Sequence, residues 1–252
     1  MPAPFRLPYP VVRLPHQTDV KHELEETTVI LRRKRGLAGL LARLPRRSAR
    51  QLIEAAAAIG LIILFAPLLL ATALAIKLTS RGPILFRQER SGLHRRVFQM
   101  YKFRTMYVDN DDSQWRQLMR EQLIADEPPT GGEPGIYKIA RDPRVTPVGK
   151  LLRQFSIDEL PQLWNVVRGE MSLVGPRPYV PWEAELFPAE VAKRFSVRPG
   201  MTGLWQVSGR STVDYRKALQ IDVHYVETKS LWLDLRILAR TAIVVFDRSG
   251  TR

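Results

Sequence analysis

The longest apolar stretch without a charged side chain runs from Ala55 to Ile76. Its length of about 22 residues meets the roughly 20 that a helix needs to cross the hydrocarbon core of a bilayer. Pro67 stands near its middle, where it removes a backbone donor and disfavours the helical conformation at Ala66. The pattern therefore predicts two helical segments joined by a bend at Ala66-Pro67.

Basic residues flank this stretch on both sides. They are Arg32, Arg33, Lys34, Arg35, Arg43, Arg46, Arg47 and Arg50 before it, and Lys77, Arg81, Arg87, Arg90, Arg95 and Arg96 after it. Because Lys and Arg favour the cytoplasmic side, a straight span would place one cluster on the disfavoured face. We therefore expect a re-entrant helix-break-helix hairpin, with a span kinked at proline and a buried core helix as alternatives.

Three other stretches carry a recognisable pattern. Residues 84–88 and 97–101 read as two short strands around a turn. Residues 231–246 form an apolar helical pattern interrupted by Asp234, Arg236 and Arg240, which is more typical of a core helix than of a membrane interface. The sequence thus predicts a small β-hairpin and a carboxyl-terminal core helix.

The remaining segments are polar or rich in proline. Residues 1–50 combine scattered prolines with a basic run and predict a mobile tail, in which residues 36–44 are a candidate surface helix. A polar helix at 113–124 precedes a loop at 126–135, which could cover a cleft. Residues 1–14 lack the apolar core of a secretory signal, so we expect no export. The expected domains are a tail at 1–50, a membrane helix at 51–80 and a cytoplasmic domain at 81–252.

The amino-acid composition limits the classes of partner and of site that the chain is expected to have. It carries 39 Lys and Arg against 25 Asp and Glu, a net charge of +14. Such a chain attracts polyanions: nucleic acid, anionic lipid head groups or phosphorylated substrates. The chain has no cysteine, which excludes disulfides, thiolate zinc sites and cysteine nucleophiles.

Two adjacent carboxylates, Asp158 and Glu159, stand where a helix is expected to begin. The structural interpretation is a capping box formed by Ser156 and Glu159, with Pro161 in the first turn. In the functional interpretation, the free backbone N–H groups and the dipole at the start of the helix stabilise anions, both a carboxylate and a phosphate. We expect Asp158 to stay ionised at neutral pH, and an ionised aspartate can attack phosphorus without a general base if a metal or arginines neutralise the phosphate. The two interpretations remain open at this point.

Several ordered blocks resemble one family, the bacterial sugar transferases, that is, monotopic polyprenyl-phosphate phosphoglycosyl transferases. The resemblance covers residues 50–252. Besides the membrane segment, the blocks are Lys102-Phe103-Arg104-Thr105-Met106, Asp142-Pro143-Arg144-Val145-Thr146, the Asp158-Glu159 block, Gly175-Pro176-Arg177-Pro178 and Val197-Arg198-Pro199-Gly200-Met201-Thr202-Gly203.

The resemblance implies a two-step reaction at the inner leaflet of the bacterial cytoplasmic membrane. Asp158 would attack a UDP-sugar, release UMP and pass the sugar 1-phosphate to undecaprenyl phosphate, as the first membrane step of polysaccharide or glycoprotein glycan synthesis. Glu159, with Asp158, would hold Mg²⁺ near the diphosphate. The implied fold is α+β and predominantly helical, with the membrane hairpin joined to a catalytic domain bearing a small β-hairpin and interfacial helices. Anionic lipids are expected partners, and a homo-oligomer is compatible with the family.

Phosphate groups gathered in one cleft require cations to offset their charge. The candidates within the family blocks are Lys102, Arg104, Arg153, Arg177 and Arg198. Pro176 and Pro178 restrict the backbone on either side of Arg177, which would hold its guanidinium at a fixed angle to a phosphate. A rigid loop whose arginine pairs with a carboxylate is the structural alternative.

Two positions depart from the family pattern: Ala66 stands where many members have serine, and Glu170 where aspartate is frequent. Three other function classes agree less well with the sequence. A glycosidase needs two carboxylates facing each other across about 5 to 9.5 Å, which sequence neighbours fit poorly. A nucleic-acid-binding protein would explain the charge, but no zinc-finger spacing or aromatic-basic block is present. A non-enzymatic membrane scaffold would not need the Asp158-Glu159 pair.

Overall fold

The computed structural model describes residues 48–108, 142–209 and 215–246, and the chain divides into two compact units, Met1–Arg46 and Arg47–Arg252. All described residues belong to the second unit. Residues 1–47 of the predicted tail, the surface helix at 36–44, the polar helix at 113–124 and the loop at 126–135 lie outside the described residues. The last residues of the predicted tail are helical instead, because Ser48 caps a helix that begins at Ala49.

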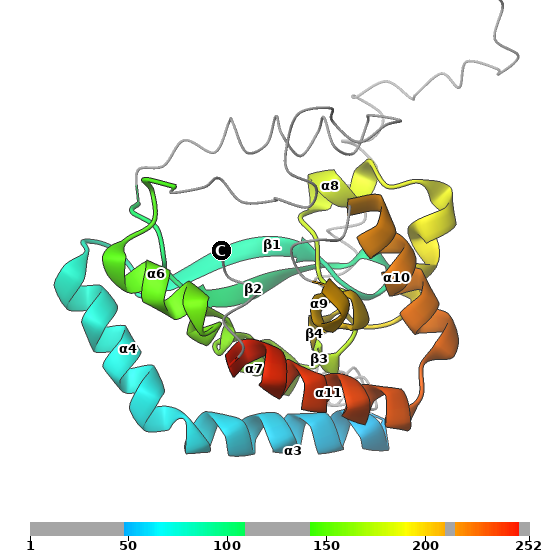
Figure 1. The fold of residues 1–252 in the computed structure, drawn as a ribbon, viewed down its shortest axis with the longest axis horizontal. Helices are drawn as coiled ribbons and strands as arrows, with labels where there is room; N and C mark the ends of the chain where they lie inside the picture. The colour runs from blue at the N-terminus through cyan, green and yellow to red at the C-terminus, as the bar shows by residue number, and fades with distance from the viewer. Residues whose placement is uncertain (1–47, 109–141, 210–214, 247–252) are drawn as a thin grey trace, which may run out of the picture. The chain divides into compact units, whose positions relative to one another are not determined.

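Helices predominate in the described part, and two small sheets accompany them (Figure 1). In chain order the elements are α3 Ala49–Leu64, α4 Ala66–Thr79, β1 Leu85–Ser91, η1 Leu93–Arg95, β2 Val97–Phe103, α6 Pro147–Gln154, η2 Ile157–Glu159, α7 Gln162–Arg168, β3 Ser172–Val174, α8 Pro181–Glu185, η3 Ala189–Ser196, β4 Gly200–Thr202, α9 Leu204–Gly209, α10 Tyr215–Thr228 and α11 Leu231–Phe246. This mixture agrees with the predicted α+β, mostly helical class.

The apolar stretch forms two helices, α3 and α4, whose axes bend by 63° (Figure 1). The break falls at Phe65, one residue before the predicted position. The Phe65 N–H donates to the Leu61 carbonyl at 2.9 Å, so the hydrogen bonding of α3 continues up to the break. Ile63 is the residue whose usual helical partner would be the missing N–H of Pro67. The bend therefore lies where proline interrupts the hydrogen bonding of the helix.

Large apolar side chains remain exposed on both helices. They are Leu52, Ile53, Ile59, Ile63 and Leu64 on α3, and Leu68, Leu70, Leu74 and Leu78 on α4. A buried core helix would enclose these side chains, so that alternative is wrong. No single helix in the described ranges has both the length and the apolarity to cross a membrane; the bent pair meets those two criteria only jointly. Membrane insertion as a hairpin stays a prediction.

The predicted β-hairpin is confirmed: β1 and β2 pair antiparallel, with Gln88 opposite Met100. Phe98 and Met100 on β2 are buried and pack in one core cluster with Ala58 of α3 and Leu163 of α7. Phe103, at the end of β2, joins a second cluster with Ile76 and Leu152. The hairpin thereby connects both halves of the bent helix pair to the rest of the domain.

A second, parallel pair of short strands joins two distant sequence blocks. The N–H of Ser172 donates to the Pro199 carbonyl at 2.8 Å, and the N–H of Gly200 donates to the Pro176 carbonyl at 2.9 Å. A Cβ atom at Gly200 would lie 2.0 Å from the Gly175 nitrogen, and one at Gly175 would lie 2.5 Å from the Arg198 carbonyl oxygen. Glycine is therefore required on both sides of this seam, which we define as β3, β4 and Gly175.

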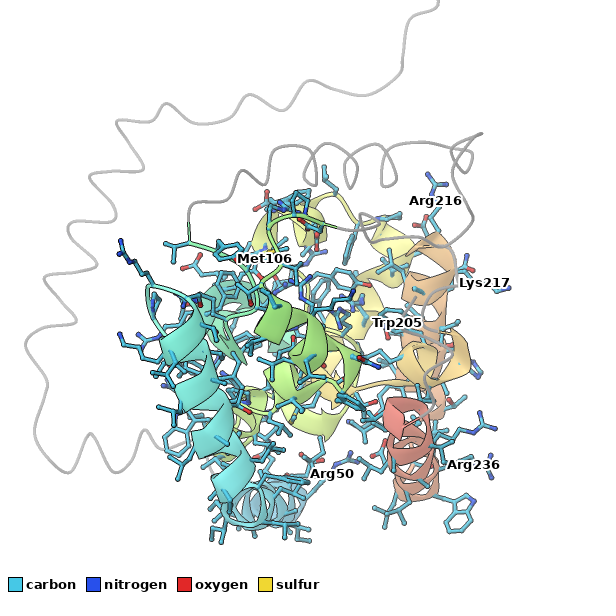
Figure 2. The ribbon with its side chains drawn as sticks, turned by 60° about the vertical axis from the view of Figure 1, so that its left-hand side comes forward. Arg50, Met106, Trp205, Arg216, Lys217 and Arg236 are labelled. Carbon is cyan, nitrogen blue, oxygen red and sulfur yellow. The ribbon has the colours of Figure 1, made fainter. Side chains whose placement is uncertain are left out.

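The carboxyl-terminal helix α11 lies beside α3 (Figure 1). Arg50 of α3 pairs with Asp234 of α11, and Figure 2 shows Arg50 reaching toward that helix. The Asp234 carboxylate also accepts a hydrogen bond from the Tyr225 hydroxyl at 2.7 Å. Ile237 is buried, but Leu231, Trp232, Leu235, Leu238 and Ile243 are exposed. The prediction of a core helix is thus wrong for most of α11, because only one face of the helix meets the domain.

Candidate active site

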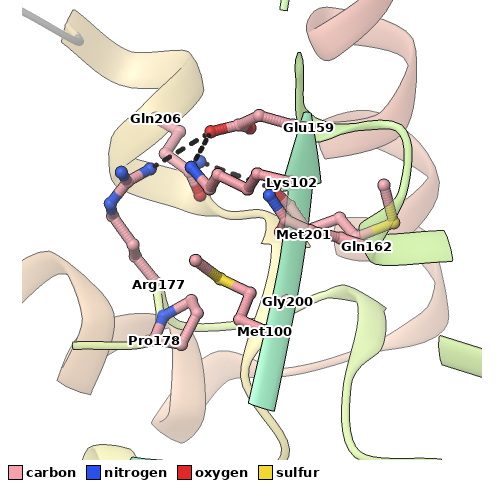
Figure 3. Close-up of a pocket in the computed structure, with 9 residues that line it drawn as sticks. All are labelled: Met100, Lys102, Glu159, Gln162, Arg177, Pro178, Gly200, Met201 and Gln206. Carbon is pink, nitrogen blue, oxygen red and sulfur yellow. Dashed lines mark hydrogen bonds and ion pairs between the residues drawn. The ribbon is translucent and has the colours of Figure 1, made fainter. Parts of the chain in front are cut away.

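A small pocket opens where β2, η2 and α7 meet β4, α9 and the loop after β3 (Figure 3). Its lining combines charged, amide and apolar side chains from segments far apart in the sequence. The lining residues are Met100, Lys102, Glu159, Gln162, Arg177, Pro178, Gly200, Met201 and Gln206. Four predicted site residues, Lys102, Glu159, Arg177 and Pro178, therefore come together in one place.

The Glu159 carboxylate faces two cations within this pocket. Lys102 Nζ lies 2.9 Å from Glu159 Oε1, and Arg177 Nη1 lies 3.9 Å from the same oxygen (Figure 3). All three side chains are partly buried. Such cations bind carboxylate and phosphate oxygens through the same charge-assisted hydrogen bonds. The arrangement can therefore receive an anionic ligand beside Glu159.

Asp158 precedes Glu159 in the turn η2 and is half-buried, although it is not one of the nine lining residues. Burial, and then the neighbouring charge of Glu159, raise the pKa of Asp158 to about 6, while Lys102 and Arg153 act in the opposite direction. A carboxyl group with this pKa is largely ionised at pH 7. The expectation that Asp158 is ionised at neutral pH is consistent with this value.

The capping-box interpretation of this turn is wrong. Ser156 adopts a left-handed conformation with φ 55° and ψ 23°, and its side chain makes no capping hydrogen bond. The helix α7 begins only at Gln162, with Pro161 as the residue before its first turn. Glu159 pairs with Lys102 instead of capping a helix. The two carboxylates are thus positioned by a 3₁₀ turn, and their charge is offset mainly by side-chain cations.

The other predicted cations occupy different places. Arg153 donates from Nε to Thr105 Oγ1 at 2.9 Å and acts on Asp158 through its charge. Arg104 is buried, and its guanidinium donates to the Ser80 and Arg81 carbonyls at 2.9 and 2.6 Å. These bonds close the carboxyl end of α4, outside the pocket.

Pro176 and Arg198, which lie next to the seam, do not line the pocket either. The Pro176 carbonyl accepts from the Gly200 N–H, and Arg198 donates from Nε to the Gly169 carbonyl at 2.7 Å. Pro176 thereby joins the Arg177 loop to β4, and Arg198 contacts Gly169, the residue that follows α7. The structure therefore assigns them a place behind the pocket, in contact with its supporting segments.

Sequence reasoning missed several lining residues, above all Gln162 and Gln206. Gln206 is buried; its Nε2 donates to the Met201 carbonyl at 3.4 Å, and its Oε1 has no hydrogen-bond partner in the part of the chain that is described. Met100 could have been found, because residues two apart on a strand share a face and Lys102 was already a candidate. For Gln206 the available signal was its position shortly after the Val197–Gly203 block.

In the described part of the chain, the candidate ligands for a metal ion at this site are the adjacent carboxylates Asp158 and Glu159. Within the described ranges no group of three or more His, Cys, Asp or Glu side chains is arranged to hold a metal ion. Mg²⁺ is commonly held by only one or two carboxylates, with substrate phosphates and water as the remaining ligands. Asp158 and Glu159 fit this mode of binding, in which the substrate supplies part of the coordination.

Comparison with known proteins agrees with the resemblance seen in the sequence. A family model described as bacterial sugar transferase matches residues 45–248. An undecaprenyl-phosphate galactose phosphotransferase of Salmonella typhimurium is 38% identical over 237 residues, which cover 93% of this chain and 47% of that protein. A UDP-glucose:undecaprenyl-phosphate glucose-1-phosphate transferase of Caulobacter vibrioides is 45% identical over 200 residues, which cover 76% of this chain and 67% of that protein.

Relatives of different lengths share the matched region. The exopolysaccharide production protein ExoY of Rhizobium meliloti is 39% identical over 194 residues, which cover 77% of this chain and 83% of that protein. By contrast, this chain spans about half the length of the Salmonella relative.

Proposed function

The chain belongs to the bacterial sugar transferase family, and on this premise we propose that it transfers a sugar 1-phosphate from a UDP-sugar to undecaprenyl phosphate. The observation that carries the proposal is the convergence of Lys102 and Arg177 on Glu159, immediately beside Asp158. Support for the acceptor comes from the Salmonella and Caulobacter relatives, which are both named for undecaprenyl phosphate, and the Caulobacter relative is also named for a UDP-sugar donor.

In the first step, an ionised oxygen of Asp158 attacks the phosphorus that bears the sugar. A bond forms between this oxygen and phosphorus, the bond from phosphorus to the bridging oxygen breaks, and UMP leaves with that oxygen. The sugar phosphate is then held on Asp158 as an acyl-phosphate, a mixed anhydride. Because the attacking carboxylate carries no proton, no general base is needed.

In the second step, an oxygen of undecaprenyl phosphate attacks the same phosphorus. The bond to Asp158 breaks, which returns the carboxylate to its ionised form and leaves a lipid-linked diphosphate sugar. Lys102 and Arg177, which line the pocket, would bind the non-bridging phosphate oxygens in both steps. Preorganised cations of this kind stabilise the charge that develops during phosphoryl transfer.

Magnesium is part of the proposal. When bound, Mg²⁺ would neutralise part of the diphosphate charge, and Glu159 with Asp158 are the carboxylates that would hold it. Lys102 and Arg177 then exchange part of their contact with Glu159 for contact with phosphate oxygens.

We place the domain at the cytoplasmic face of the bacterial inner membrane. Support comes from the exposed apolar side chains of α3 and α4 and from the basic residues at both ends of the pair. With a re-entrant arrangement, reporter tags at residues 1 and 252 should both report the cytoplasm. Tags on opposite sides would identify a spanning helix and exclude the hairpin.

The proposal is tested with membrane-extracted protein incubated with Mg²⁺ and a panel of UDP-sugars, scored by UMP release. One UDP-sugar is expected to give an amount of UMP close to the amount of enzyme without acceptor, and continuous release once undecaprenyl phosphate is added. Absence of UMP with every donor would reject the proposal. Salt-sensitive retention on DNA without UMP release would favour a nucleic-acid-binding protein.

The raised pKa of Asp158 predicts a pH dependence. Because a protonated carboxyl is a poor nucleophile, the rate of the first step at subsaturating UDP-sugar and Mg²⁺, which reports the carboxyl before metal binds, should fall about tenfold per pH unit below pH 6 and level off above it. Measuring UMP release without the lipid acceptor removes the titration of the acceptor phosphate from the profile. A rate that stays constant down to pH 4 would contradict the assignment of Asp158.

A further inference from the structure

Arg177 lies in a loop whose backbone is anchored at consecutive positions. The carbonyls of Pro176 and Tyr179 accept hydrogen bonds from the backbone N–H groups of Gly200 and Ser91 at 2.9 and 2.8 Å. The Pro178 carbonyl accepts from Arg90 Nη1 at 3.2 Å. The carbonyl of Arg177 itself has a side-chain donor from a more distant element.

That donor is Arg194 of η3, which links the loop to Asp222 of α10. Arg194 Nη2 lies 2.6 Å from the Arg177 carbonyl oxygen and 2.6 Å from Asp222 Oδ2. The exposed fractions of the two charged side chains are 2% and 0%. One nitrogen atom therefore joins a fully buried carboxylate to the backbone of the residue that reaches into the pocket.

Aromatic rings enclose the Arg194 guanidinium. Its central carbon lies 4.5 Å from the ring centre of Tyr179, 5.2 Å from that of Phe195 and 5.4 Å from that of Phe187. Rings at these distances attract the cation and exclude water from it. Burial raises the pKa of Asp222 to about 6, and both the Arg194 guanidinium and the Arg177 backbone N–H counteract that increase.

The loop geometry explains why one hydrogen bond matters. Pro176 and Pro178 have fixed φ angles, and Arg177, which precedes a proline, is restricted to extended conformations. Holding the Arg177 carbonyl then fixes the peptide plane between Arg177 and Pro178. With that plane fixed, the direction in which the Arg177 side chain leaves the backbone is also fixed.

We propose that Arg194 and Asp222 are positioning residues that hold the Arg177 guanidinium in register with Glu159 and with the substrate phosphate. The proposal rests on the proposed function, since it assigns this pair to the phosphate site of the same reaction. A buried ion pair is weak support for stability alone, because its desolvation opposes its attraction. A role in orienting Arg177 gives the pair a purpose that an apolar pair of the same size would not fulfil.

The test is a double-mutant cycle with Arg194→Lys and Arg177→Ala. Lysine keeps the charge but loses the planar fork of donors. In the parent protein Arg194→Lys should lower kcat/KM about tenfold to a hundredfold, as expected for a misplaced binding group. In the Arg177→Ala background the same substitution should change kcat/KM by less than about twofold, because its target is gone. Asp222→Asn is the second variant and should behave in the same way.

A matched control comes from the same two elements. Lys193 of η3 pairs with Glu227 of α10 at 2.9 Å, and both side chains are half exposed. Lys193→Met removes a link between η3 and α10 without touching the loop, so it should leave kcat/KM within about twofold of the parent. Thermal unfolding of every variant separates loss of fold from loss of positioning.

Equal losses in the two backgrounds, or no loss in the parent, would overturn the positioning role. The affinity for UDP is also measured by calorimetry for each protein of the cycle. Arg194→Lys should weaken UDP binding only when Arg177 is present. Because this readout needs no turnover, a protein that binds UDP but releases no UMP from UDP-sugars would refute the proposed function and still decide the role of Arg194.

Discussion

Asp158→Asn is expected to lower turnover by about a thousandfold or more, the scale seen when an enzyme loses its nucleophile. Asparagine has nearly the same shape, but its neutral amide oxygen cannot form the acyl-phosphate. The sugar phosphate should therefore no longer be trapped on the protein. The measurements are UMP release and the intact mass of the protein after incubation with the UDP-sugar alone.

The same substitution carries its own folding control. Burial raises the pKa of Asp158 from 3.8 to about 6, so the charged form is disfavoured in the folded state; stability falls as the pH rises between these two values, and the full cost is present above pH 6. Asp158→Asn should accordingly unfold at the same temperature as the parent or higher. Glu89→Gln makes the same carboxylate-to-amide change at an exposed position of β1 and should leave the rate unaltered. Full activity of Asp158→Asn would remove the nucleophile assignment.

Chelation with EDTA should lower the rate by about a hundredfold or more, which is the second large effect. The pocket offers Lys102 and Arg177 against the negative charges of Asp158, Glu159 and the substrate diphosphate. Together with Arg153, which acts on Asp158 through its charge, these cations offset only part of the negative charge, so we expect a divalent ion to take part. Added Mg²⁺ in excess of the chelator should restore the rate.

EDTA saturated with Mg²⁺ beforehand is the matched control for that experiment. It supplies the same chelator and ionic strength without depleting the metal, so the rate should remain unchanged. If metal-free EDTA also left the rate undiminished, the metal role of Asp158 and Glu159 would be refuted.

Local patterns predicted much of the fold. The β-hairpin follows from alternation and turn residues, and the helix break follows from Pro67, because both depend on neighbouring residues. The exposure of α11 did not follow from its apolar composition. Burial depends on which faces meet other elements, and the Arg50–Asp234 pair that docks α11 on α3 joins residues 184 positions apart.

The sequence identified the charged residues of the candidate site but not the neutral ones. Lys102, Glu159 and Arg177 stood out because each lies in a block shared with the family and because phosphate transfer requires cations and a metal-binding carboxylate. Arg104 carried the same signal, yet the structure uses it to close α4, since a buried guanidinium can satisfy backbone carbonyls as well as phosphates. Gln162 and Gln206 carried no charge, and only the folded arrangement places their amides in the pocket.

The glycine seam bears on any attempt to alter the donor sugar. Since no side chain fits at Gly175 or Gly200, residues 172–178 and 198–203 are coupled through their backbones, and a substitution at one would displace the other. Libraries for engineering should therefore keep both glycines constant. Diversity is better placed at Gln162 and Gln206, whose amides line the pocket and do not belong to the seam; Met100 should stay constant because it packs in the core.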